Sequence, residues 1–224
     1  MVKTNRLTGL QPADRFINHF RVRLKRMDRS EKKELAKTRI GKAAARVFNE
    51  KGFLETTIVD IASAAKISKG GVFHYFPTKS GILYHVLNEY MDLVLEGLEE
   101  NLKEIERGSS RVQFIISHHI DLYDRNTAEA KLLLHEAHNL PGKQFKPIAE
   151  KEKKYFQIVA SVLSDYVNGF DSKEELTGVT FTLFGMLNWI YSWYSPRGSL
   201  NPKELSEIIY NIFTKGVVSY RRTR

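Results

Sequence analysis

The chain has 224 residues, of which 42% are hydrophobic, and this is enough apolar material for a sizeable core rather than a disordered chain. The absence of cysteine excludes a disulfide scaffold, a thiol nucleophile and a thiolate metal site. No apolar run of about 18 residues occurs, and the start of the chain lacks the apolar segment of a signal peptide. We therefore expect a soluble, cytoplasmic protein that does not bind membranes.

The net charge of +9 is unevenly distributed along the chain. Residues 1–36 contain ten Lys or Arg and four Asp or Glu, and residues 37–85 contain eight and three. Residues 86–224 contain 17 basic and 19 acidic residues. The first 85 residues therefore favour a polyanionic partner, with a solvated basic tail as the alternative.

Helical periodicity runs through most of the sequence, and no stretch alternates as a strand does. We predict an all-α protein with a small basic head joined by a long helix to a larger helical body. The predicted elements are a helix at 35–50, two short helices within 57–76, a long helix from Thr78 to the break at 108–110, and helices near 110–125, 128–138, 144–168, 172–194 and 202–220.

Residues 57–76 have the length and pattern of a helix-turn-helix. Alanines at positions 62, 64 and 65 allow two helices to cross closely, and the residues that follow Ser68 are small or basic, as suits a helix N-terminus in a major groove. His74, Tyr75 and Lys79 follow at a spacing that suits contacts with DNA phosphates. The predicted DNA-contacting residues are Thr57, Ser68, Lys69, Gly70, Gly71, His74, Tyr75 and Lys79.

The run TIVDIASAAKISKGGVFHYFPTK, residues 57–79, resembles the DNA-binding domain of TetR-family transcriptional regulators. Residues 44–53, AARVFNEKGF, look like the first helix of that domain. The resemblance implies a turn at 65–68, a recognition helix at 68–75 and a phosphate contact from Lys79. Two positions depart from the family pattern. Lys66 stands where a turn glycine is usual, which indicates either a strained backbone or a slightly different turn, and Phe73 stands where Tyr is frequent.

Residues 1–36 are a predicted basic N-terminal extension to the helix-turn-helix domain at 37–85. Within it, an apolar stripe is surrounded by arginines and lysines, and Pro12 suits the first position of a helix. The stripe consists of Phe16, Phe20, Leu24 and Met27. A frayed basic helix or a wrongly assigned start, an arm that grips DNA phosphates, and a membrane-surface helix are the alternatives.

Residues 86–224 are the predicted effector-binding and dimerisation domain, as the resemblance implies. Residues 176–194 are apolar on nearly all sides, and residues 205–217 carry a second apolar stripe. Two such helices per subunit would form a four-helix interface, with an ordinary buried core helix as the alternative. The predicted homodimer residues are Leu183, Leu187, Ile208 and Ile212.

Residues 187–205 look like the C-terminal signature of TetR-family members that respond to acyl-CoA in lipid degradation. An acyl-CoA needs an apolar tunnel and cations for its phosphates, although for any single lysine a solvated surface position is the favoured interpretation. A cationic or aromatic drug-like effector is the alternative. The predicted effector-binding residues are Phe114, His118, Leu122, His138, Lys143, Lys146, Tyr155, Trp189, Trp193 and Arg197.

These observations together predict a ligand-responsive repressor that is released from a palindromic operator by an acyl-CoA or related lipid. An α-helical enzyme is the alternative from another class, but no nucleophile elbow, P-loop or dinucleotide motif occurs. A sequence-independent architectural DNA binder would explain the basic head but not the large body. No cofactor is predicted, and the spacing of His135 and His138 does not form a metal motif.

Overall fold

The computed structural model describes residues 28–195 and 198–222, and within them it is helical without a strand, which confirms the predicted all-α class. The predicted features of residues 1–27, and Arg197, lie outside the described residues. The helices are α2 Arg29–Lys51, α3 Ile58–Ala65, α4 Lys69–Tyr75, α5 Lys79–Leu95, α6 Leu98–Glu104, α7 Ser109–Arg125, α8 Thr127–Glu136, α9 Gly142–Tyr166, α10 Lys173–Asn188 and α11 Pro202–Arg222, with 3₁₀ turns at Ala137–Asn139 and Trp189–Ser192.

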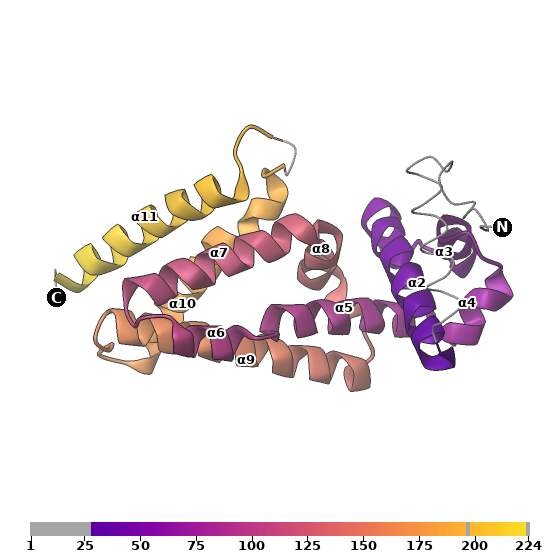
Figure 1. Cartoon of the computed structure of the whole chain (residues 1–224), viewed down its shortest axis with the longest axis horizontal. Helices are drawn as coiled ribbons and strands as arrows, with labels where there is room; N and C mark the ends of the chain where they lie inside the picture. Colours follow the sequence, from indigo (N-terminus) through magenta and orange to yellow (C-terminus); the bar gives the residue numbers. More distant parts are fainter. Residues whose placement is uncertain (1–27, 196–197, 223–224) are drawn as a thin grey trace, which may run out of the picture.

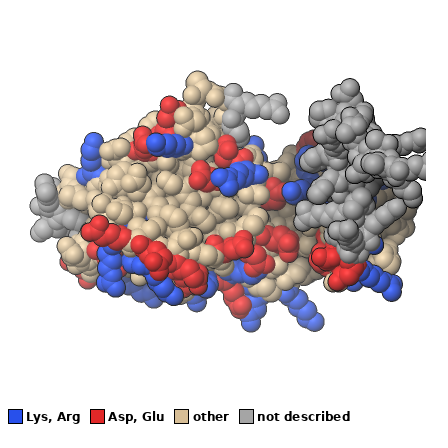
Figure 2. Space-filling view, viewed as in Figure 1, with Lys and Arg blue, Asp and Glu red and all other residues tan. Residues whose placement is uncertain are grey.

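The molecule is elongated, with α2, α3 and α4 forming a head at one end and the remaining helices a longer body (Figure 1). Helix α5 runs from the head into the body, where it packs against α9, while α7 packs along α11. Acidic and basic side chains gather along the edge of the body formed by α6 and α9, and a broad uncharged area lies above them (Figure 2). In the described residues, no helix has both the length and the apolar character needed to cross a bilayer.

Local capping interactions set the helix ends of the head. Thr57 and Asp60 form a capping box at the start of α3, in which the Thr57 side chain accepts from the Asp60 amide and the Asp60 side chain accepts from the Thr57 amide. Ser68 caps α4 in the same way through the amide of Gly71. Lys66, at the end of α3, adopts the left-handed conformation with φ 55° and ψ 47°. Of the two alternatives for this turn residue, the structure therefore has the left-handed backbone that is unfavourable for a non-glycine residue.

Three helix boundaries differ from the sequence prediction. The long helix predicted from Thr78 to residue 107 is divided into α5 and α6, because Gly97 has a positive φ of 64° that interrupts the helical path. Helix α2 begins at Arg29, so residues 29–36 are its first turns. The helix predicted at 172–194 ends at Asn188 and continues as a 3₁₀ turn.

Candidate DNA interface and effector cavity

Helix α4 presents one face to the head and the other to solvent. Val72 is fully buried beneath the helix, whereas Lys69, Phe73 and His74 are exposed. Lys69 Nζ lies 5.9 Å from the centre of the Phe73 ring. Because Gly70 and the following glycine carry no side chains, the start of α4 presents bare backbone that can approach a DNA groove closely.

The residues predicted to contact DNA gather at α4 and its flanks, and most of them are exposed. Thr57, Ser68, Lys69, Gly70 and His74 are exposed, while Gly71 and Tyr75 are partly buried. The Thr57 and Ser68 hydroxyls already accept backbone hydrogen bonds as helix caps, so each shapes its helix start. The contacts of all these residues with DNA remain predictions.

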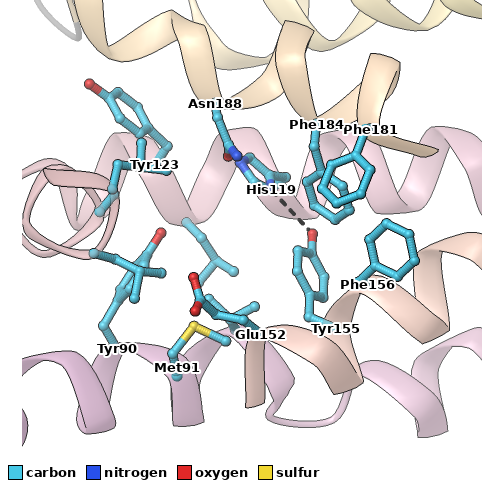
Figure 3. A pocket seen from close by; sticks show the side chains of 15 residues that line it. Tyr90, Met91, His119, Tyr123, Glu152, Tyr155, Phe156, Phe181, Phe184 and Asn188 are labelled. Carbon is cyan, nitrogen blue, oxygen red and sulfur yellow. Dashed lines mark hydrogen bonds between the residues drawn. The ribbon is translucent and has the colours of Figure 1, made fainter. Parts of the chain in front are cut away.

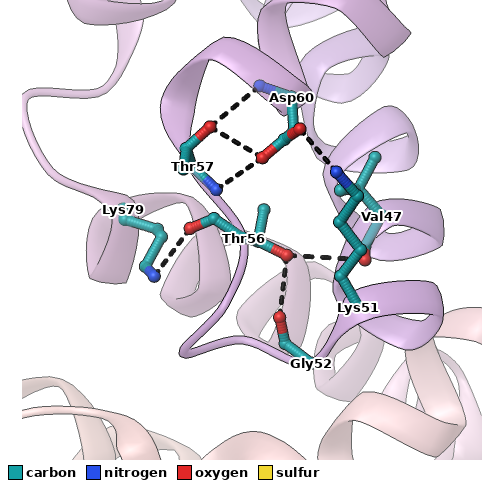
Figure 4. Close-up of polar contacts among 7 residues, drawn as sticks. All are labelled: Val47, Lys51, Gly52, Thr56, Thr57, Asp60 and Lys79. Carbon is teal, nitrogen blue, oxygen red and sulfur yellow. Dashed lines mark hydrogen bonds and ion pairs between the residues drawn. The ribbon is translucent and has the colours of Figure 1, made fainter.

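Lys79, the first residue of α5, is differently placed from the expected phosphate contact. Its ammonium group donates hydrogen bonds to the carbonyl oxygens of Phe53, Leu54 and Thr56 at 2.6, 2.9 and 2.8 Å. An ammonium group has three donors, so all of them are engaged by the loop between α2 and α3. Figure 4 shows the bond to Thr56. In this arrangement Lys79 holds the loop that precedes the helix-turn-helix.

The same loop is also bonded to the body. The backbone amide of Phe53 donates to Glu136 Oε1 at the end of α8, at 3.3 Å. Nearby, the side-chain amide of Asn49 donates to the carbonyl oxygen of Ala128 at 2.8 Å. The start and the end of α8 are thus both hydrogen-bonded to the head. The sequence analysis did not identify Asn49 and Glu136, because the partner of each lies about 80 positions away in the chain.

A cavity of about 190 Å³ lies inside the body, between α5, α7, α8, α9 and α10. Its walls are mainly apolar and aromatic, and three phenylalanines gather at one side of it (Figure 3). The lining residues are Tyr90, Met91, Val94, His119, Leu122, Tyr123, Ala130, Leu133, Leu134, Glu152, Tyr155, Phe156, Phe181, Phe184 and Asn188.

A few polar groups interrupt this apolar lining. His119 Nδ1 and the Tyr155 hydroxyl are 3.2 Å apart and hydrogen-bonded, and the Asn188 side chain lies beside the imidazole (Figure 3). Burial lowers the pKa of His119 to about 4, helped by neighbouring His118, so the imidazole is neutral near pH 7. Burial also raises the pKa of the Tyr155 hydroxyl well above its usual range. These neutral groups can donate or accept hydrogen bonds to a ligand without carrying charge.

Of the predicted effector-binding residues that the structure describes, only Leu122 and Tyr155 line this cavity. His118 is turned away from it, because adjacent residues on a helix point in different directions. Its Nε2 instead lies 3.0 Å from the carbonyl oxygen of Val94, and its ring stacks on Phe114. His119 takes the place that was expected for His118.

Five further predicted effector residues lie on the surface, whereas Phe114 is partly buried against the core outside the cavity. Each of the five is exposed and none is part of the cavity lining; they are His138, Lys143, Lys146, Trp189 and Trp193. The lysines stand in the first turns of α9, where the side chains extend into solvent. Among the described residues, the predicted effector-binding residues therefore do not form a cationic site at the cavity.

The predicted interface residues divide into two groups. Leu183 and Leu187 are fully buried within their own chain, which corrects the expectation that they face a partner: the inner stripe of α10 packs on the body. Ile208 and Ile212 on α11 are exposed, by 46% and 61%. Phe181 on α10 is 62% exposed, but it lines the cavity and packs against Phe156 of α9.

A groove of about 530 Å³ runs between the outer faces of α10 and α11. Gly178 and Gly216 line it, and a side chain added at either position would meet no atom within 4 Å. Ile212, whose side chain projects from α11, also lines the groove. Such a combination of a hollow and projections on one apolar surface suits a self-complementary contact.

Comparisons with known proteins agree with this architecture. Residues 40–86 match the family described as bacterial regulatory proteins, tetR family, and residues 106–217 match the tetracyclin repressor-like C-terminal domain. The chain is 30% identical to the fatty acid metabolism regulator protein of Bacillus subtilis (strain 168) over 136 residues, which cover 60% of this chain and 69% of that protein.

Two solved structures are similar over most of the chain. A TetR-family transcriptional regulator from Bordetella parapertussis 12822 is 28% identical with a TM-score of 0.76, covering 79% of this chain and 93% of that chain. AibR in complex with isovaleryl coenzyme A and operator DNA is 26% identical with a TM-score of 0.69, covering 79% and 97%. The chain belongs to the TetR family of DNA-binding transcriptional regulators, and its relatives are regulators rather than enzymes.

Proposed function

We propose that this protein is a ligand-responsive transcriptional repressor whose effector occupies the body cavity and releases the head from operator DNA. The observation that carries the proposal is the position of the cavity: two of its walls, α5 and α8, also hold the head through Lys79 and Glu136. A ligand that favours one arrangement of these helices will shift the population of DNA-binding molecules. We assign DNA binding to residues 37–85 and effector binding and dimerisation to residues 86–224.

We further propose an acyl-CoA, or a related lipid, as the effector. The apolar cavity lining supports this choice, as do the names of two relatives, a fatty acid metabolism regulator and a protein bound to isovaleryl coenzyme A. Burial of apolar chain contributes roughly 0.8 kcal/mol per methylene before ordering costs. A few buried methylenes are therefore enough to bias two conformations that differ by a few kcal/mol.

A drug-like cation is the second candidate, and Glu152 is the observation that favours it. This carboxyl lines the cavity and stays partly exposed, and burial raises its pKa. A cationic ligand would stabilise the ionised carboxylate, whereas a phosphate-bearing ligand would be repelled by it. The two effector classes therefore predict opposite effects of the substitution Glu152→Gln on ligand affinity.

The proposed repressor acts as a homodimer. A palindromic operator needs two recognition helices about 34–36 Å apart, or a multiple of one helical turn. The outer face of α10 and α11, with its mainly apolar groove and its exposed Ile208 and Ile212, supports a twofold contact between two copies.

Thermal unfolding with a panel of ligands tests the effector class, because a ligand at 100 times its Kd stabilises the folded state by about 2.7 kcal/mol. Decanoyl-CoA should raise the melting temperature and release the protein from an operator duplex, whereas free CoA should do neither. Stabilisation and release by tetraphenylphosphonium, with no response to any acyl-CoA, would favour the cation. A protein that responds to neither class would contradict the effector proposal.

A further inference from the structure

The loop between α2 and α3, residues 53–56, is held by two separate helices of the body. Lys79 on α5 donates to three of its carbonyl oxygens. Glu136, the last residue of α8, accepts from the Phe53 amide, and its other carboxylate oxygen accepts from Asn139 at 2.7 Å. The backbone amide and carbonyl of Phe53 are therefore bonded to two different helices.

Both of these helices line the effector cavity. Tyr90 and Met91 on α5 form part of the wall, and Leu133 and Leu134 on α8 form another part. Helix α8 has ten residues and is therefore about 15 Å long at 1.5 Å per residue. A ligand that displaces Leu133 or Leu134 therefore moves the whole of this short helix, whose C-terminal end is hydrogen-bonded to the head.

The start of α8 is bonded to the head as well. The amide of Asn49 donates to the carbonyl oxygen of Ala128 and to that of Ala45, each at 2.8 Å. Helix α8 is therefore connected to α2 at one end and to the loop before α3 at the other. The loop leads directly into Thr57, the cap of the first helix of the helix-turn-helix.

We propose that Asn49 and Glu136 are positioning residues that carry the effector signal from the cavity to the helix-turn-helix through α8. The proposal rests on the proposed function, in which a ligand in the cavity changes operator affinity. The two side chains touch neither the cavity nor the recognition helix, so their removal uncouples the two binding events. Because the coupling between two binding sites is reciprocal, the binding of operator DNA must also change the conformation or stability of α8.

The first test measures operator Kd with and without decanoyl-CoA, on a duplex selected with the wild-type protein from a random-sequence library. The ratio of the two Kd values should fall at least about fivefold in Glu136→Ala and in Asn49→Ala, within the coupling range of roughly 5–150-fold. Operator Kd without ligand, and ligand Kd without DNA, should each change less than about threefold. Glu136→Gln should keep most of the ratio, because its amide oxygen can still accept from Phe53.

Asn211→Ala is the matched control. The Asn211 amide donates to the carbonyl oxygen of Glu207, four residues earlier, as Asn49 does within its own helix, but it makes no described bond to another helix. This variant should keep the wild-type ratio. A wild-type ratio in both Glu136→Ala and Asn49→Ala would overturn the proposal.

The second test needs no effector. Amide hydrogen exchange in residues 127–136 should slow when operator DNA binds the wild-type protein, and this response should be lost in Glu136→Ala. An α8 that does not respond to DNA in the wild-type protein would overturn the coupling role. If α8 responds but no acyl-CoA changes operator binding, the coupling role is supported and the proposed effector class is the part that fails.

Discussion

Lys79 Nζ lies 4.6 Å from the centre of the Phe53 ring and donates a 2.6 Å hydrogen bond to the carbonyl oxygen of the same residue. The ammonium group thus makes two kinds of interaction with the loop between α2 and α3: a cation–π contact with the ring and hydrogen bonds to the backbone.

This relationship predicts separate phenotypes for two lysines of the head. Lys79→Met should lower the free energy of unfolding by about 1–3 kcal/mol, because three carbonyl groups lose their donor, and leave the salt dependence of operator binding unchanged. Lys69→Ala should leave stability unchanged and reduce the slope of log K against log salt by about 1, as loss of one phosphate contact does. Urea unfolding and binding at several salt concentrations measure both quantities. A reduced salt slope with normal stability in Lys79→Met would instead establish the phosphate contact.

The apolar face of α10 and α11 predicts that different substitutions will affect dimerisation and folding stability. Ile212→Asp should shift the sedimenting species from dimer to monomer, since burying an unpaired charge at the interface costs several kcal/mol. Leu183→Ala should lower stability by about 2–5 kcal/mol and leave the dimer intact, because Leu183 is buried within one chain. Gln157→Asp, an exposed position on α9, is the charge control. A monomeric wild-type protein at micromolar concentration would contradict this assignment.

The left-handed backbone of Lys66 predicts a stabilising substitution. The conformation costs roughly 1–2 kcal/mol in a non-glycine residue, and glycine avoids this cost while losing about 0.5–1 kcal/mol through the entropy of the unfolded chain. Lys66→Gly should therefore raise stability by up to about 1 kcal/mol, whereas Lys66→Ala, which keeps the strain, should not. Equal stability of the two variants in urea unfolding would show that the turn is unstrained.

The lowered pKa of His119 predicts a loss of stability in acid. Its folded-state pKa of about 4 lies below the ordinary value of 6.5, so the unfolded chain binds the proton more tightly. The stability of the wild-type protein should be highest above pH 6.5 and fall from there towards pH 4, by at most about 1.4 kcal/mol per pH unit. Urea unfolding at several pH values measures this slope. It should be smaller in His119→Gln, while His138→Gln, which removes an exposed histidine, should follow the wild type.

The local features of the head could be predicted from the sequence, because they depend on residues three or four positions apart. The caps at Thr57, Ser68 and Thr78 are bonds between neighbours in the chain. The strain at Lys66 likewise follows from the residue type in a turn. The all-α class and the family resemblance rest on the same short-range patterns, and the matched family models agree with them.

The cavity and the connection between body and head were decided only by the tertiary structure. Whether Leu183 faces the core or a partner depends on the rotation of α10 about its axis, which periodicity does not define for a helix that is apolar on nearly all sides. Whether His118 or its neighbour faces the cavity depends on how α7 packs against the helices around it. The partners of Lys79 and Glu136 in the loop between α2 and α3 are 23 or more positions away. Such bonds form only when packing brings distant segments together. The sequence therefore shows which groups are able to form hydrogen bonds, and the tertiary structure determines which of them are paired.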